Sequence, residues 1–166
     1  MATLDSLTST YKAIEKTLHG FIKGYENAKI HNDPSLVNSH LAPDCQRRPL
    51  PSSFLKSLGA PPGITISNDM YQQNFATILP FHGIHKSDIS NVTIDVWAKK
   101  AAATSVYRGK YSDGEAYSLD MAWYLTFNDD GTQVTDIVMF MDAIEQPKFK
   151  AKCDKLAEEL KAKDEE

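Results

Sequence analysis

The sequence has few cysteines, no excess of basic residues and no long hydrophobic run, and each shortage excludes a class of protein. Its 166 residues include only Cys45 and Cys153, too few for a disulfide framework or a cysteine-based zinc site, so both are expected to be free thiols. The net charge is −4, whereas a general nucleic-acid binder needs clustered Lys and Arg. No apolar stretch reaches the ~18 residues of a transmembrane helix. We therefore expect neither a nucleic acid nor a membrane as partner.

Motifs of nucleotide-dependent and hydrolytic enzymes are also missing. The sequence has no Gly-rich phosphate loop, no Gly-x-Ser-x-Gly elbow and no Cys–His nucleophile pattern. His82 and His85 are spaced like some metal ligands, but no acidic or cysteine partner is near them and Gly83 between them indicates a loop, so no metal site is predicted. The class of chemistry that remains is acid–base or positioning catalysis in an apolar pocket.

The composition is that of one globular domain, with 42% hydrophobic and 24% charged residues. We assign residues 1–150 to this domain and residues 151–166 to a charged helical tail. The start, "MATLDSLTSTYK", lacks the basic flank and apolar run of a signal peptide, so the expected location is cytoplasmic.

Helical periodicity dominates the first half of the chain. Apolar residues recur at three- and four-residue steps from Leu4 to about Ile30, with Asp5 or Ser6 as the expected cap. A short second helix follows in residues 31–45, and a third is predicted from Asn68 to Leu79. The Pro- and Gly-rich run of residues 49–64 is expected to be a long loop.

After Pro80 the period changes to 2, which predicts strands. Four are expected, at residues 89–98, 101–111, 116–127 and 134–142, and the turns "SDG" and "NDDG" indicate hairpins. Three N-terminal helices packed on a curved antiparallel sheet, followed by a C-terminal helix, make an α+β fold.

Period 2 also divides the candidate site residues between two sheet faces. Tyr107 and Tyr111 share one face of their strand and can donate hydrogen bonds or protons in an apolar cavity. Asp120 is the only charge in the third strand, and a one-residue difference in hairpin register would move it to the other set of side chains in the last strand. The sequence leaves this register open.

The stretch "PDCQRRPLP", residues 43–51, places Arg47 and Arg48 among prolines. The prolines predict a turn that ends the second helix and opens a strand or loop. The two arginines are either solvated surface residues or the edge of a binding site.

Several segments of the sequence together resemble the SnoaL-like cyclases and isomerases of the nuclear-transport-factor-2-like superfamily. They are "LAPDC", the basic pair, "LPSSF", the "NDMYQQNF" helix, "YLTFNDDG" and "VMFMDA". They are most similar to a fungal branch that acts in meroterpenoid and alkaloid biosynthesis. The resemblance covers about Tyr11 to Phe149. It implies a cone-shaped α+β barrel, a homodimer, a hydrophobic polycyclic substrate and cofactor-independent rearrangement or cyclisation by proton transfer and shape.

The resemblance is not complete at the site. Where such proteins carry His after the Asp-Cys pair, this chain has Arg47 and Arg48, and Met139 replaces a Glu of the final strand. Asp120 and Asp142 match acidic positions of the family.

These residues give a working hypothesis for the mechanism. Arg47 or Arg48 polarises a substrate carbonyl or oxyanion, Asp120 moves a proton with help from Tyr107 or Tyr111, and Asp142 completes the catalytic set. The expected apolar substrate-binding wall consists of Tyr25, Tyr71, Phe75, Trp123, Met139 and Met141.

Two alternatives remain open at this point. One is a carrier or partner-binding module that uses the same cavity without chemistry. The other is a dehydratase similar to scytalone dehydratase, which requires His82 or His85 to point into the pocket.

Overall fold

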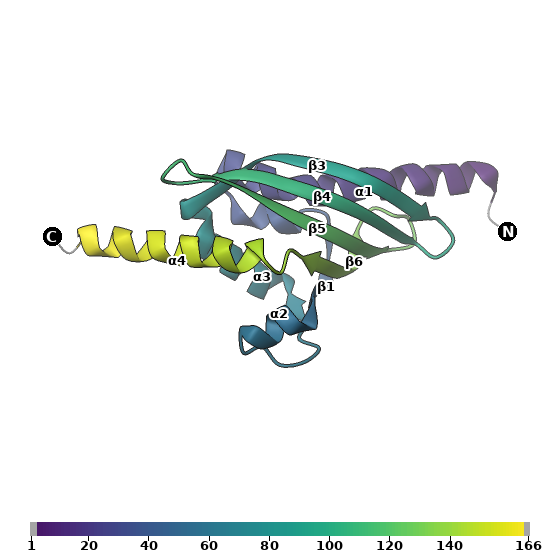
Figure 1. The fold of residues 1–166 in the computed structure, drawn as a ribbon. Coiled ribbons are helices and arrows are strands. Elements are labelled where there is room, and N and C mark those ends of the chain that lie inside the picture. Colours follow the sequence, from purple (N-terminus) through teal and green to yellow (C-terminus); the bar gives the residue numbers. More distant parts are fainter. Residues whose placement is uncertain (1–2, 165–166) are drawn as a thin grey trace.

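Two long helices flank a curved six-stranded sheet (Figure 1). The structure is a computed structural model and describes residues 3–164. Helix α1 spans Leu4–His31 and buries its apolar stripe, which includes Leu18, Phe21 and Tyr25. Its N-cap is Thr3, whose side chain accepts a hydrogen bond from the Ser6 amide, so the expected Asp5 or Ser6 cap was wrong by two or three positions.

The segment between α1 and the hairpins contains more regular structure than predicted. It comprises η1 (Pro34–Asn38), β1 (Leu41–Leu50), α2 (Ser52–Ser57), β2 (Ile66–Ser67) and α3 (Asn68–Ile78). The second helix is thus a single 3-10 element, and Asp33 caps it. The predicted loop of residues 49–64 contains α2, while the third helix is confirmed within one residue of its predicted end.

Strand β1 corrects the prediction of a turn at "PDCQRRPLP". All but the last residue of this stretch lies in β1, which pairs in parallel with β6. Prolines are tolerated here because β2, the neighbour on the other side, pairs with only Gln46 and Arg47, so most of β1 is an edge strand. The parallel pair makes the sheet mixed rather than purely antiparallel.

The remaining strands form the predicted meander. They are β3 (His82–Asp95), β4 (Lys100–Tyr111), β5 (Ala116–Phe127) and β6 (Val134–Met141), in the sheet order β2-β1-β6-β5-β4-β3. The first strand was misplaced, because β3 begins seven residues before the predicted start and residues 96–98 are in a turn. The α+β class and the curved sheet covered by helices are confirmed, and the sheet is open.

The register settles which side chains face inward. Trp123 lies opposite Met139 and Met121 opposite Met141, so these residues share the face that packs on α1. Asp120 lies opposite Val106 and is exposed on the outer face. Gly131 adopts φ 77° in the β5–β6 turn, as the predicted Asp-Asp-Gly turn requires.

Helix α4, Glu145–Asp164, begins against the sheet and then extends away from it (Figure 1). Phe149, Cys153 and Leu156 are buried in the core, and they anchor α4 from its first turns to just beyond its middle. Lys152 fixes it further through ion pairs of 2.7 Å to Asp113 and 2.6 Å to Glu115. No helix within residues 3–164 is long and apolar enough to cross a membrane.

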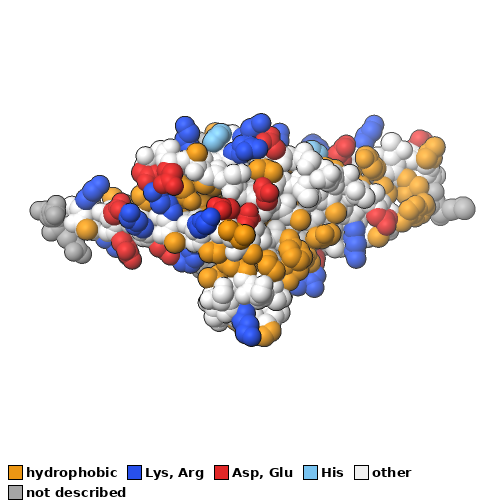
Figure 2. All heavy atoms as spheres, in the orientation of Figure 1, with side chains coloured by type: hydrophobic (Ala, Val, Ile, Leu, Met, Phe, Trp, Pro, Cys, Tyr) orange, Lys and Arg blue, Asp and Glu red, His pale blue; other side chains and the backbone are white. Residues whose placement is uncertain are grey.

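The outer face of the sheet exposes several large side chains, including Tyr124 and Phe140. In Figure 2 hydrophobic side chains gather where the sheet meets the α2 region. The homodimer implied by the resemblance stays a prediction. Sedimentation of the purified chain measures its oligomeric state directly.

Candidate functional site

An interior cavity of about 70 Å³ lies between the inner face of the sheet and helices α1, α3 and α4. Its wall is almost entirely aromatic and aliphatic, as expected of a site for a hydrophobic molecule. The structure brings together here all the residues expected to form the apolar wall: Tyr25, Tyr71, Phe75, Trp123, Met139 and Met141.

A vestibule of about 450 Å³ adjoins the cavity between α2, α3, β6 and α4. The two hollows share the side chains of Tyr71, Phe75, Ile78, Met139, Met141, Gln146 and Phe149. Small-molecule pockets usually measure about 300–1,000 Å³. The interior cavity alone therefore fits only one end of a polycyclic molecule, and the vestibule can hold the rest.

His82 lines the cavity and differs from the tyrosines around it because it can act as a base near neutral pH. It begins β3, is buried, and packs edge-on against Phe149 with ring centroids 4.8 Å apart. Its Nδ1 lies 2.8 Å from the hydroxyl of Tyr117, and no group within residues 3–164 hydrogen-bonds to its buried Nε2. Burial, and then the charge of Lys29, lower the pKa of His82 to about 4, so the ring is neutral at physiological pH.

His85 differs from His82 although the sequence pairs them. The register of β3 and β4 shifts between Ile84 and Lys86, which leaves His85 at a bulge and exposed. The expectation that both histidines lie in a loop was wrong, because β3 is longer than its period-2 pattern indicates.

A second polar group on the cavity wall is a pair of tyrosines. The Tyr25 hydroxyl donates a 2.9 Å hydrogen bond to the Tyr71 hydroxyl, whose own hydrogen stays available to a ligand. Burial raises the pKa of Tyr25 well above its ordinary value, with a further contribution from Tyr71, so Tyr25 remains protonated. Tyr71 lines both hollows and lies at their junction.

Arg47 lies behind these tyrosines. Its guanidinium carbon is 4.0 Å from the centroid of the Tyr71 ring, a cation–π contact. The side chain is fully buried, yet its hydrogen-bond acceptors are neutral: Asn38 Oδ1 at 2.8 Å, the Val37 carbonyl at 3.2 Å and Asn68 Oδ1 at 3.3 Å. A positive charge in a low-dielectric site acts strongly on negative charge that develops nearby.

Arg48 points the opposite way. It forms a 2.6 Å ion pair with Asp136 on the outer face, and about half of its side chain is exposed. Neighbouring residues of a strand face opposite sides of the sheet, which explains the different surroundings of the two arginines.

The other predicted catalytic residues lie outside the polar part of the cavity. Tyr107 lines the cavity, but its hydroxyl donates to the Ile22 carbonyl at 3.0 Å. Tyr111 packs on Tyr117 and Phe149 behind the wall. Asp120 faces outward, and Asp142 Oδ1 accepts from the amides of Ile144 and Glu145 at 2.9 Å each, so it caps α4.

Sequence reasoning missed Tyr117 and Gln146 and did not place His82. Tyr117 stands on the same period-2 face as Trp123, which is a usable sequence pattern. Gln146 lies in a helix start with few apolar residues, and nothing in its spacing indicates a cavity. Helix α4 reaches the site only because Phe149 and Cys153 pack into the core.

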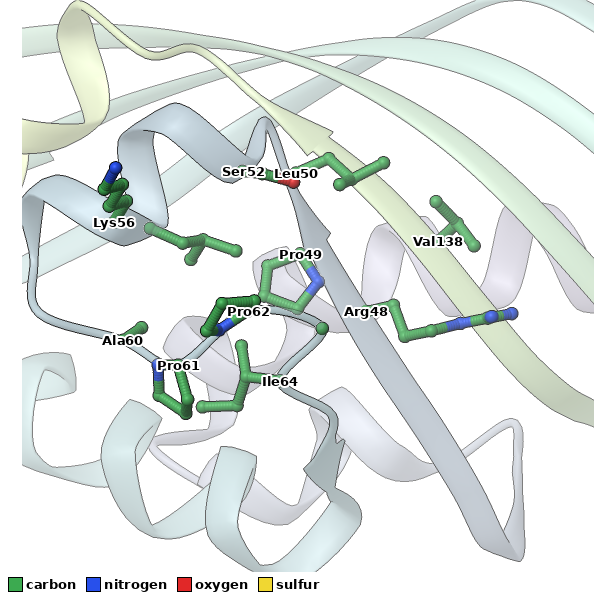
Figure 3. Close-up of a pocket in the computed structure, with 12 residues that line it drawn as sticks. Arg48, Pro49, Leu50, Ser52, Lys56, Ala60, Pro61, Pro62, Ile64 and Val138 are labelled. Atoms are coloured by element: carbon green, nitrogen blue, oxygen red, sulfur yellow. The ribbon is translucent and has the colours of Figure 1, made fainter.

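A larger hollow of about 480 Å³ lies elsewhere, between β1, α2 and the Pro61-Pro62 loop (Figure 3). Among the described residues that line it, Arg48 and Lys56 are the charged ones, and Arg48 extends away from the loop. In the described part of the chain no group of three His, Cys, Asp or Glu side chains is placed to hold a metal ion. The aromatic cavity with its vestibule is therefore the candidate site.

Comparison with protein-family models and with curated protein sequences finds no significant match. Solved structures do match. The pinacolase BvnE from Penicillium brevicompactum is 20% identical, with a TM-score of 0.68 over 89% of this chain and 98% of its own. PrhC from Penicillium brasilianum is 17% identical, with a TM-score of 0.65 over 87% and 92% of the two chains.

An NTF2-like protein from Burkholderia pseudomallei also matches, at 16% identity and a TM-score of 0.56 over 82% of this chain and 96% of its own. Together with the open curved sheet and its covering helices, these matches confirm the fold that the sequence motifs implied. The chain has the nuclear-transport-factor-2-like fold.

Proposed function

We propose that the protein is a cofactor-independent isomerase or cyclase of secondary metabolism that rearranges a hydrophobic, polycyclic small molecule by proton transfer. The observation that carries this proposal is a neutral, buried histidine in an aromatic cavity, whose Nε2 has no hydrogen-bond partner within residues 3–164. Buried titratable groups with displaced pKa values are typical of catalytic acids and bases.

His82 is the proposed proton carrier. In the tautomer whose Nδ1–H donates to the Tyr117 oxygen, the Nε2 lone pair has no partner within residues 3–164 and is the proposed base that removes a proton from a substrate carbon. The electron pair of that C–H bond becomes part of an enol or enolate. The imidazolium is disfavoured by burial, so it returns the proton readily to another substrate atom, and the overall change is an isomerisation.

Tyr71 is the proposed partner for the oxygen that gains negative charge. Its hydrogen is free to donate because the Tyr25 hydroxyl already donates to its oxygen. The buried charge of Arg47 beside the Tyr71 ring stabilises negative charge on that substrate oxygen. Arg47 thus acts through Tyr71 as a positioning and electrostatic residue, whereas Arg48 and Asp120 take no part in the step.

The matches with solved structures support an enzyme, since one of them is named a pinacolase. Their low identity restricts the inference from them to the fold, and a shared fold does not fix a reaction. The assignment of chemistry to this chain depends on the His82 and Tyr71 geometry.

Deuterium exchange into 2-tetralone tests the proposal. The ketone has acidic hydrogens beside its carbonyl and two fused rings that match the apolar cavity and vestibule. We expect the wild-type protein in D₂O to exchange these hydrogens faster than buffer does. The part of the exchange rate that exceeds the rate in buffer should be about 100-fold lower in the His82→Gln variant than in the wild type. General base catalysis typically contributes 10²–10⁴-fold.

His85→Gln is the matched control, because it changes an exposed histidine of the same strand. It should keep the exchange rate of the wild type. Exchange that survives in folded His82→Gln, or that disappears in His85→Gln, would contradict the proposed role of His82.

Elimination of water is a second candidate, favoured by the inward orientation of His82. Its partner in the cavity is Tyr117 rather than an aspartate. A product that is lighter than its substrate by one water molecule identifies a dehydratase, whereas an isomerase leaves the mass unchanged.

A further inference from the structure

Gln146 is a polar side chain in the apolar wall of the candidate site. The residue lies in the first turn of α4 and lines both the interior cavity and the vestibule. Its Oε1 atom is buried, and none of the protein groups in residues 3–164 donates a hydrogen bond to it.

An oxygen in this state is unfavourable for the protein by itself. A buried acceptor without a donor destabilises the folded state by about 1–3 kcal/mol relative to a satisfied one. The neighbouring wall residues Phe149, Met139 and Met141 offer no strong donor. Turning the side-chain amide towards the two hollows that Gln146 lines lets a molecule that enters the site supply the donor.

The surroundings also restrict the chemistry of that donor. Placing an ammonium group in an apolar cavity carries a large desolvation penalty. The charge of Lys29 already contributes to the lowered pKa of His82 in this cavity, and Arg47 lies behind the wall. A neutral hydroxyl group satisfies the acceptor without adding positive charge.

We propose that Gln146 is a specificity-determining residue that accepts a hydrogen bond from a hydroxyl group of the substrate. The substrate class is then a hydroxylated, hydrophobic carbocycle whose hydroxyl lies near the end that reaches His82. This inference rests on the proposed function, because it takes the cavity and vestibule as the substrate site.

Such a contact discriminates more sharply than apolar packing does. A site built to hydrogen-bond a hydroxyl rejects the analogue that lacks it, because the buried acceptor is then left unpaired. Apolar lining residues distinguish ligands that differ by one methylene group only weakly.

Calorimetric titration with 2-tetralol and with tetralin tests the inference, since the two bicyclic probes differ in one hydroxyl group. We expect wild-type protein to bind 2-tetralol roughly tenfold more tightly than tetralin. In Gln146→Met, which keeps the side-chain length but removes the amide, the preference should disappear through weaker binding of 2-tetralol. Gln73→Met is the matched control, since it makes the same change at an exposed position of α3 that does not line the cavity or the vestibule and should keep the preference.

Thermal unfolding without ligand supplies a second measurement. Because Gln146→Met removes an unsatisfied buried oxygen, its melting temperature should equal or exceed that of the wild type. Equal binding of both probes to wild-type protein, or a preference that survives in Gln146→Met, would overturn the inference.

The exchange assay separates this inference from the function on which it depends. If 2-tetralone exchange requires His82 but the hydroxyl preference is absent, the role of Gln146 is wrong and the proposed function stands. If the wild-type protein neither exchanges 2-tetralone nor binds either bicyclic probe, both are wrong.

Discussion

Charged side chains have opposite surroundings on the two faces of the sheet. Arg47 and Arg48, at adjacent positions of β1, show the difference. Arg47 is 0% exposed and is held by neutral acceptors, whereas the Arg48 side chain is 51% exposed and pairs with Asp136. The outer face also carries the ion pairs of Arg108 and Lys86 with Asp88. Charges on the outer face are paired and screened by solvent, while the charge behind the inner face can act on a bound molecule.

The largest expected difference in stability is between the Arg47→Ala and Arg48→Ala variants. Arg47→Ala should lower the free energy of unfolding by about 3 kcal/mol, because acceptors on η1 and α3 lose a charged donor. Arg48→Ala should lower it by at most about 1 kcal/mol, as is usual for an exposed ion pair. Urea unfolding measures both. An equal decrease in the free energy of unfolding in both variants would contradict the difference proposed between the inner and outer faces.

Acid should destabilise the protein through His82. Its pKa is about 4 in the folded protein and ~6.5 in an unfolded chain, so the unfolded state binds more protons between these values. Stability is therefore full above about pH 6.5 and falls by about 3 kcal/mol as the pH drops to about 4. His82→Gln should remove this part of the slope in urea titrations at pH 7 and 4.5.

The neighbours of His82 define the control for that experiment. Lys29 contributes to the lowered pKa, and Tyr117 stays neutral because burial raises its pKa. The pKa of His40 is also lowered, by burial and then Lys16. His40→Gln should therefore remove a separate and smaller part of the pH dependence. An unchanged slope in His82→Gln would mean that His82 is accessible to protons in the folded state.

Two tyrosines on opposite faces give a smaller contrast. Tyr107→Phe removes a buried hydroxyl and leaves the Ile22 carbonyl without that donor, so it should lower stability by about 1–2 kcal/mol. Tyr124→Phe removes an exposed hydroxyl of the outer face and should change stability by less than about 0.5 kcal/mol. Thermal or urea unfolding of the pair decides whether burial is the cause.

Asp120→Asn should have the smallest effect of all. Asp120 is exposed on the outer face, so both the free energy of unfolding and the 2-tetralone exchange rate should stay close to those of the wild type. A large loss of exchange in this variant would return the proton-transfer role to Asp120 and contradict its assignment to His82.

Regular periodicity explains which elements were predictable. Helices α1 and α3 and strands β4, β5 and β6 have strong 3.6- or 2-residue patterns, and the predictions match them closely. Strand β1 was missed because its two internal prolines resemble a turn, and only its edge position makes them compatible with a sheet. The start of β3 was also missed, because the bulge at His85 interrupts the period-2 pattern.

The candidate site was predictable where it consists of apolar faces. All six expected wall residues line the cavity, because side chains on one face of a strand or helix meet the same core. The polar groups could not be predicted in the same way. His82 depends on an irregular strand, Gln146 on how α4 docks, and the choice between Arg47 and Arg48 on the register of β1 with β6.

The sequence by itself determined an α+β chain with an aromatic inner face, since local periodicity fixes which side chains leave water together. Only the tertiary structure decided which polar groups join that face. Their positions depend on strand register, a bulge and the docking of the terminal helix, which are set by contacts between residues distant in sequence. This is why His82, Tyr71 and Gln146 line one cavity although no motif links them.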